Sequence, residues 1–153
     1  MRFLTRFTSA RTLTAVALLA AMPVVAACGG GTDSPSSPSP NQPRGEYSQT
    51  DLVVGTGATV VLGSRVAVAY GGWLYDPTRA DNKGTQFDGS NGAVFTIAPG
   101  AIIQGWVQGV VGMQVGGRRR LVIPPELGYG AQGNGPIPPN ATLVFDVELL
   151  AVQ

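Results

Sequence analysis

The chain has 153 residues and a formal net charge of +1, a length that fits one domain with appended segments. It contains no histidine and one cysteine, which excludes a Ser-His-Asp triad, a histidine zinc site, an intrachain disulfide and a cysteine metal cage. The small net charge, without an extended basic stripe, argues against nucleic-acid binding.

The first 27 residues predict a secretory signal. Arg2, Arg6 and Arg11 precede an apolar stretch, residues 13–27, and no acidic residue occurs in this part of the chain. The stretch is about fifteen residues long, which is shorter than the ~20 apolar residues of a membrane-spanning helix. Such a length is typical of the apolar region of a cleaved signal peptide. An uncleaved signal anchor is the alternative.

The signal ends in VVAAC, and these small residues before Cys28 resemble the lipobox of bacterial lipoproteins. The resemblance implies that the Cys28 thiol takes a diacylglyceryl group and that residues 1–27 are then removed. A secreted protein with a stray cysteine is the alternative. Loss of the three arginines leaves a net charge of −2, so we expect the lipid rather than charge to hold the protein at the membrane. The folded part would then lie outside the cytoplasm, in the cell envelope or periplasm.

Residues 29–44, GGGTDSPSSPSPNQPR, predict a disordered linker. They lack hydrophobic periodicity and cannot bury enough apolar surface to offset the entropy lost on ordering. We therefore assign residues 28–45 to the lipidated cysteine and its linker, and residues 46–153 to a folded domain. Because the linker shows no helical dimerisation segment, we expect a monomer.

Alternation of side chains predicts four strands in the domain. In the first strand Val66, Val68 and Tyr70 share one face, and alanines occupy the other. The last strand, ATLVFDVELLAVQ, is predicted to bury one face. The four predicted strands are residues 64–76, 92–100, 118–124 and 141–153.

One segment has the spacing of an amphipathic helix. Apolar residues recur at i, i+1, i+4, i+5 and i+8, which predicts a helix of about two to three turns. The 22 glycines and 12 prolines favour turns and short strands elsewhere. The predicted fold class is therefore α+β, with antiparallel strands packed on one short helix. The apolar residues of the helix are Ile102, Ile103, Trp106, Val107 and Val110.

Two segments rich in glycine and proline, residues 76–86 and 128–140, are predicted to be loops. The run Arg118–Arg120 has two interpretations, a nucleic-acid patch or alternate arginines that project outward along a strand. We favour the strand and expect no nucleic-acid partner.

Six aromatic side chains are spread along the predicted domain, and no acid–base pair accompanies them. On pattern alone, aromatic residues in a small β-rich domain are more often core than binding pocket. The six are Tyr70, Phe87, Phe95, Trp106, Tyr129 and Phe145.

Residues 51–153 contain four motifs in chain order, VAVAYGGWLYD, QFDGS, IIQGWVQGVVGMQVGGRRRLVIPPELGYG and GPIPPNATLVFDVELL. By the order and the spacing of these motifs, the segment resembles the FKBP-type peptidyl-prolyl cis-trans isomerase domain. The resemblance implies an FKBP-like fold, in which an antiparallel half-barrel sheet wraps around one short helix. It also implies a rotamase, an enzyme that accelerates rotation about X-Pro bonds.

The resemblance further implies an apolar pocket between the sheet and the helix. Trp106 would form its floor at the N-terminal end of the helix. Tyr70, Phe87 and Phe145 would form its walls.

Five further residues would surround this pocket by the same resemblance. Ile102 and Ile103 would line the rim, with the Ile103 backbone N–H facing a substrate carbonyl. Tyr129 would offer its hydroxyl to a substrate carbonyl. Asp88 would lie at the polar edge, and Ile137 would close the top.

Rotation about an amide needs neither a base nor a covalent step, which suits a chain without histidine. We therefore expect no cofactor and no metal. The expected partners are proline-containing segments of exported or envelope proteins, and macrolides of the tacrolimus and rapamycin type. The family commonly has a second aromatic residue two positions before Phe95, where this chain has Ala93, so we expect a thinner wall and weaker macrolide binding.

Two other functions remain as alternatives. The first is a non-catalytic module that holds proline-containing segments of exported proteins. The second is a structural surface lipoprotein with a degenerate pocket, which would bind no tacrolimus-like ligand.

Overall fold

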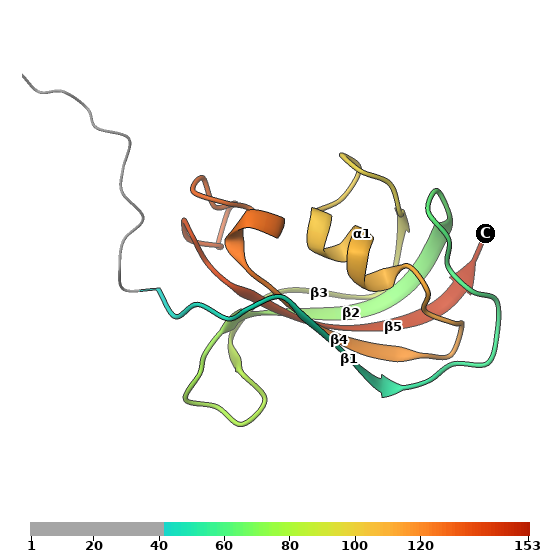
Figure 1. Cartoon of the computed structure of the whole chain (residues 1–153), viewed down its shortest axis with the longest axis horizontal. Helices are drawn as coiled ribbons and strands as arrows, with labels where there is room; N and C mark the ends of the chain where they lie inside the picture. The colour runs from blue at the N-terminus through green and yellow to red at the C-terminus, as the bar shows by residue number, and fades with distance from the viewer. Residues whose placement is uncertain (1–41) are drawn as a thin grey trace, which may run out of the picture. The chain divides into compact units, whose positions relative to one another are not determined.

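The computed structural model describes residues 42–153, which form a five-stranded antiparallel sheet and one short helix (Figure 1). The strand order is β1-β4-β5-β2-β3. This arrangement confirms the predicted α+β, FKBP-like fold. The elements are β1 (Ser48–Val53), β2 (Arg65–Tyr75), β3 (Lys83–Thr96), α1 (Gln104–Val110), β4 (Arg118–Ile123), the 3₁₀ turn η1 (Pro125–Leu127) and β5 (Leu143–Val152).

The predicted signal peptide, the lipidated Cys28 and nearly all of the predicted linker lie outside the described residues. Among residues 42–153, no helix has the length and apolar character needed to cross a bilayer.

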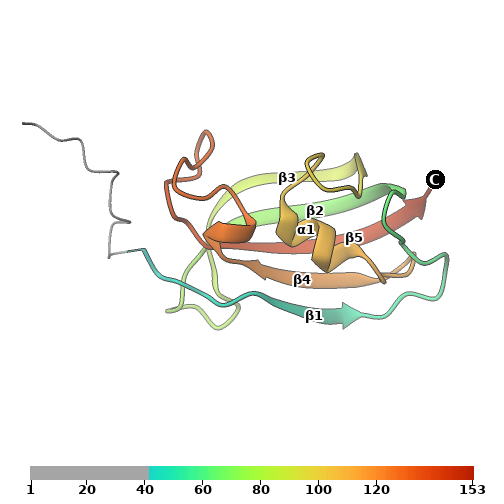
Figure 2. The same ribbon diagram turned by 45° about the horizontal axis from the view of Figure 1, so that its top comes forward.

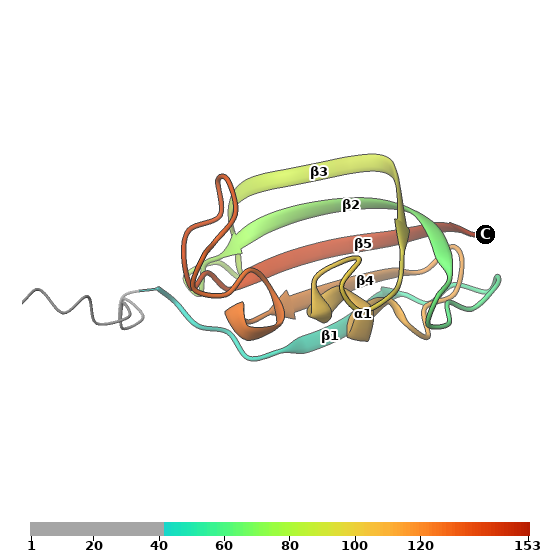
Figure 3. The ribbon, with the colours of Figure 1, turned by 90° about the horizontal axis from the view of Figure 1, so that it is seen from above.

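The helix α1 lies across one face of the curved sheet, as Figures 2 and 3 show from two sides. Its contact with β4 depends on two glycines one helical turn apart. A Cβ atom on Gly105 would collide with the side chain of Ile123, and one on Gly109 with Leu121. The helix can therefore approach β4 closely only because these two positions carry no side chain.

The helix is shorter than its apolar stripe predicted. It contains seven residues, and Ile103 precedes it with an extended ψ of 144° and no side-chain cap. Ile102 and Ile103 therefore lie before the helix, not in it. Tertiary contacts hold so short a helix: the Tyr47 hydroxyl donates to the Gly105 carbonyl at 3.3 Å, and the Arg119 guanidinium donates to the Gly109 carbonyl at 2.7 Å.

Two strand predictions need correction. β3 begins at Lys83 rather than at residue 92, because residues of the predicted loop 76–86 pair with the end of β2, Lys83 with Tyr75 and Gln86 with Trp73. The remaining turn closes at Asn82, which has a left-handed φ of 56°. β1 was not predicted, because all six of its residues are exposed and leave no alternating pattern of apolar residues.

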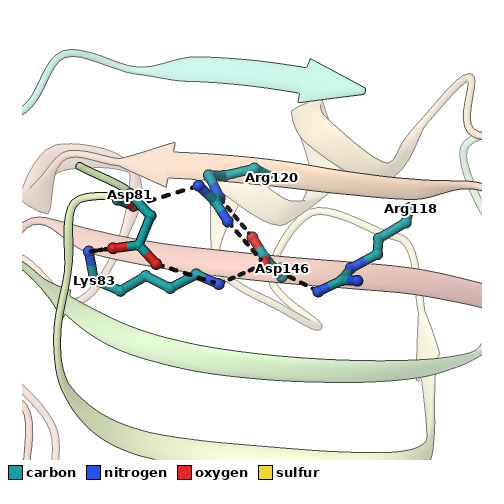
Figure 4. A network of polar contacts seen from close by, with 5 residues as sticks. All are labelled: Asp81, Lys83, Arg118, Arg120 and Asp146. Carbon is teal, nitrogen blue, oxygen red and sulfur yellow. Dashed lines mark hydrogen bonds and ion pairs between the residues drawn. The ribbon is translucent and has the colours of Figure 1, made fainter. Parts of the chain in front are cut away.

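The last strand buries both faces over its first half, whereas its alternation predicted one buried face. Phe145 points to the side of α1, so Asp146 points to the opposite side of the sheet. Asp146 is nevertheless only 4% exposed, because three basic side chains converge on it (Figure 4). An ion-pair cluster therefore covers this part of the outer face.

The cluster joins three strands through one carboxylate. Lys83 of β3 lies 2.6 Å from Asp146 Oδ2, and Arg120 of β4 contacts both oxygens at 2.7 and 3.0 Å. Arg118 contacts the same carboxylate at 3.3 Å. Burial alone would raise the pKa of Asp146, but hydrogen bonds from Arg120 and Lys83 outweigh it and hold the pKa below its ordinary value.

The arginine run therefore alternates across the sheet as predicted, but its members are ion-paired rather than free. Arg118 and Arg120 contact Asp146, and Arg119 points to the other face, where it pairs with Asp51 and the C-terminal end of α1.

Replacing Asp146 by alanine should lower the free energy of unfolding by about 3–5 kcal/mol, because it leaves three cations together without their carboxylate. Urea unfolding followed by tryptophan fluorescence measures the change. The control is Glu126→Ala, which removes an exposed pair with Arg44 and should cost about 0–1 kcal/mol. Equal losses for the two variants would contradict a structural role for the cluster.

Candidate active site

A cavity of about 110 Å³ opens between α1, the sheet and the loop after η1. Of the nine site residues predicted from the sequence, the structure places eight around this cavity. The residues that line it are Tyr70, Phe87, Asp88, Phe95, Ile102, Ile103, Trp106, Tyr129 and Phe145.

Ile137 and Phe95 differ from the sequence-based description. Ile137 is buried at 6% exposure and packs in the hydrophobic core, outside the set of residues that line the cavity. Phe95 lines the cavity, although it was noted only as an aromatic residue of the domain. The signal available in the sequence was an aromatic residue within the predicted strand 92–100.

Trp106 forms the floor of the cavity. It is 2% exposed and lies in the first turn of α1, where the chain enters the helix after Ile103. Its ring meets Tyr70, Phe95 and Phe145 edge to face, with centroid distances of 5.3, 5.4 and 5.5 Å. Such edge-to-face pairs are favourable arrangements of aromatic rings, so the floor is rigidly held.

The opposite wall depends on Gly72 in the middle of β2. A Cβ atom on Gly72 would lie 2.8 Å from the Phe145 ring and 2.9 Å from the Phe87 ring. The two rings therefore rest on bare backbone and meet edge to face at 5.6 Å. No alternation of apolar residues signals this role for Gly72.

The polar edge of the pocket is formed by Tyr70 and Asp88. The Tyr70 hydroxyl donates to Asp88 Oδ2 at 2.6 Å, and the Gly89 amide donates to Oδ1 at 2.8 Å. Burial, and then the hydrogen bond to Asp88, raise the pKa of Tyr70 to about 12. Asp88 is thus oriented by two donors, and Tyr70 keeps its proton at neutral pH.

The loop that carries Tyr129 is fixed by backbone hydrogen bonds. The amides of Gly128 and Gly130 both donate to the Pro125 carbonyl, at 3.0 and 2.9 Å. The Asn140 amide donates to the Gly130 carbonyl at 2.8 Å, which ties the two ends of the loop together. Tyr129 is therefore held in the lining of the cavity.

Two other hollows are larger, but their linings differ in character. One, of about 500 Å³, lies between the segment Arg44–Tyr47 and residues Pro124–Glu126. The other, of about 230 Å³, lies on the outer face of the sheet beside Trp73 and Asp146. The first has one aromatic residue in its lining and the second has two, against six around the smaller cavity, so the smaller aromatic cavity is the candidate site.

The lining contains a carboxylate and two phenols but no residue placed as a nucleophile with an adjacent base. Within the described part of the chain, no group of three Asp, Glu or Cys side chains could hold a metal ion. A half-open aromatic pocket with polar groups at its edge is typical of a site that binds an apolar segment of a ligand or peptide.

The comparisons with known proteins agree with this class. The family model for FKBP-type peptidyl-prolyl cis-trans isomerases matches residues 57–150. An FK506-binding protein of Neisseria meningitidis serogroup A is 46% identical over 103 residues, which cover 67% of this chain and 92% of that protein. The chain therefore belongs to the FKBP-type peptidyl-prolyl cis-trans isomerase family and is an enzyme of that class.

Solved structures show the same fold. The crystal structure of a peptidyl-prolyl cis-trans isomerase from Pseudomonas syringae pv. tomato has a TM-score of 0.60 and 38% identity, and the match covers 70% of this chain and 75% of that one. FkpA from Escherichia coli has a TM-score of 0.59 and 39% identity, and the match covers 70% of this chain and 48% of that one.

The raised pKa of Tyr70 predicts a late ionisation step. An exposed tyrosine loses its proton near pH ~10, whereas Tyr70 should keep it until about pH 12. The unfolded chain releases this proton first. The stabilisation is therefore complete below pH ~10 and is lost as the pH rises towards about 12. Phenolate absorbance and urea unfolding measure the two effects.

Two variants test whether Tyr70 is the residue that ionises in this step. Tyr70→Phe should remove it, and Asp88→Asn should move it to lower pH because the carboxylate charge is gone while burial remains. An unchanged titration in Tyr70→Phe would show that another tyrosine ionises last.

Proposed function

We propose that this isomerase acts on proline-containing segments of exported or envelope proteins, and that its pocket stabilises the twisted amide. The observation that supports the mechanism is the convergence of aromatic rings on Trp106, without a base or nucleophile beside them. Rotation about a peptide bond requires loss of amide resonance against a barrier of ~18–20 kcal/mol. It needs no proton transfer to a base.

The apolar walls favour the twisted state over the planar one. A planar amide carries more charge separation than a twisted amide, so removing water disfavours the planar ground state. Donors aimed at the twisted carbonyl add to this preference. Lowering the barrier by about 6–8 kcal/mol would accelerate rotation roughly 10⁴–10⁶-fold.

Two groups are suited to donate to the substrate. The backbone hydrogen bonds of residues 42–153 leave the Ile103 amide N–H free, and Ile103 lines the pocket. The Tyr129 hydroxyl is the second donor in this proposal. Asp88, already held by Tyr70 and Gly89, supplies a fixed negative edge rather than a proton acceptor.

We also propose that the pocket binds macrolides of the tacrolimus and rapamycin type, with lower affinity than a relative that has a second aromatic residue at position 93. Ala93 lies two residues before Phe95 on β3 and therefore on the same face. It is absent from the cavity lining, so this wall is thinner.

Replacing Tyr129 by phenylalanine should lower kcat/KM for a proline tetrapeptide about tenfold, which is the loss of one hydrogen bond to the twisted carbonyl. A cis-to-trans exchange assay on the purified full-length protein measures it. The control is Tyr75→Phe at the end of β2, a tyrosine outside the pocket. If neither the protein nor any variant accelerated exchange, the chain would be a binding module and the proposed function would fail.

We further propose that the chain is exported and held at the membrane through lipid on Cys28, with the isomerase domain as a monomer outside the cytoplasm. The support is the short apolar stretch after the N-terminal arginines and the small residues before the cysteine.

Intact-mass analysis of the native protein tests the proposed processing and membrane attachment. We expect residues 1–27 to be missing and Cys28 to carry acyl chains. The Cys28→Ala variant should be released from the membrane fraction. A native mass that includes residues 1–27 without added lipid would show that the predicted processing is wrong.

A further inference from the structure

One end of the domain exposes several aliphatic side chains without any charge among them. Segments 52–64 and 89–117 contain no Asp, Glu, Lys or Arg. They nevertheless include Val54 at 74% exposure, Val61 at 61% and Leu62 at 60%. We call the surface formed by the exposed side chains Val53, Val54, Val61, Leu62 and Val111 the apolar end.

Backbone hydrogen bonds bring the parts of the apolar end together. The Gly112 amide donates to the Val60 carbonyl at 3.0 Å, and the Val60 amide donates to the Met113 carbonyl at 2.9 Å. Val61 and Leu62 are therefore next to the segment that carries Val111. Val53 and Val54 line one depression with Gly112 and Gln114, and the ion pair of Asp51 and Arg119 lines the same depression. The segments that carry these five exposed side chains are therefore neighbours, and contiguous exposed apolar surface is a feature of binding sites.

The apolar end continues into the rim of the active site. The Gly63 amide donates to the Ile97 carbonyl and the Ile97 amide to the Ser64 carbonyl, both at 2.8 Å. Residues 98–101 then lead directly to Ile102 and Ile103 at the pocket. Figure 1 shows α1 and this segment on one side of the sheet, and the loop before β2 passes round the end of the sheet to reach that side. The segment that joins the two places, residues 97–103, contains no charged residue.

We propose that the apolar end is a second contact surface for the unfolded polypeptide whose proline bond occupies the pocket. The segment that binds there is extended and rich in uncharged, apolar residues. This inference rests on the proposed function and names the substrate class: long unfolded chains rather than short proline peptides. Continuity with the pocket favours this occupant, because one extended chain can reach both places at about 3.3 Å per residue.

The charge distribution also favours such a segment. A surface for anionic lipid places clusters of basic residues beside its apolar side chains. The apolar end is bordered by Arg65, and the nearby Arg119 is already paired with Asp51 at 2.5 Å. The Asp146 cluster, by contrast, lies on the opposite face of the sheet (Figure 4).

The test compares three probes on the purified full-length protein. They are the tetrapeptide Ala-Leu-Pro-Phe and two peptides of about twenty residues that share its Leu-Pro centre, long enough to extend beyond the pocket. One long peptide has arms of Val, Leu, Ala, Gly and Gln, and the other has Lys and Glu at alternate arm positions. We expect about tenfold higher kcat/KM for the apolar peptide than for the charged one, since its arms bury apolar surface.

The double variant Val61→Thr/Leu62→Gln should lose this tenfold preference and keep its activity on the tetrapeptide. The matched control is Leu150→Gln, an aliphatic residue that is 41% exposed but points to the other face, since its neighbour Leu149 is buried in the core. It should leave all three activities unchanged.

Fluorescence anisotropy of the labelled long peptides measures binding separately from isomerase activity. Tighter binding of the apolar peptide, lost in the double variant, supports the apolar end as a contact surface even if no probe is isomerised. A lack of isomerisation of all three probes would count against the proposed function alone. Equal binding of the two long peptides would overturn the proposal and leave the isomerase activity intact. A double variant that changed only self-association or binding to phosphatidylglycerol vesicles would also overturn it.

Discussion

The close contact between α1 and β4 is the constraint on which the rest of the structure depends. A seven-residue helix has little stability of its own, so its position is set by what it packs against. Gly105 and Gly109 allow its backbone to approach Ile123 and Leu121, and Tyr47 and Arg119 donate to its carbonyls. This seating places Trp106 beneath the cavity and leaves the Ile103 amide N–H free at its rim.

The two faces of the sheet divide the physical tasks. The helix α1 covers one face of the sheet. On this face, aromatic rings from β2, β3 and β5 meet over the backbone of Gly72, which has no side chain. On the outer face, Asp146 of β5 draws together Lys83 from β3 and the two arginines Arg118 and Arg120 from β4. Charge is thus concentrated away from the pocket, whose function in our proposal depends on excluding water. The strand that places Phe145 in the pocket is also held by the cluster around the next residue.

Much of the fold and site followed from the sequence, and the failures have physical causes. Strands with one buried face, such as β2, show alternation that reflects burial directly. β1 was missed because all six residues are exposed, and the start of β3 was missed because backbone pairing with Tyr75 and Trp73 orders a segment that looks like a loop. Gly72 was missed because its contribution is the absence of a side chain.

The sequence by itself determined the α+β class, the absence of histidine chemistry and, through the resemblance of its motifs, the family and most of the pocket. These properties are local or compositional. Only the tertiary structure decided which residues share the cavity, since Phe95 enters it and Ile137 lies in the core. It also decided that Asp146 is buried and that the aliphatic residues of two distant segments form one exposed end. Such properties arise from contacts between residues far apart in the chain, which no local pattern encodes.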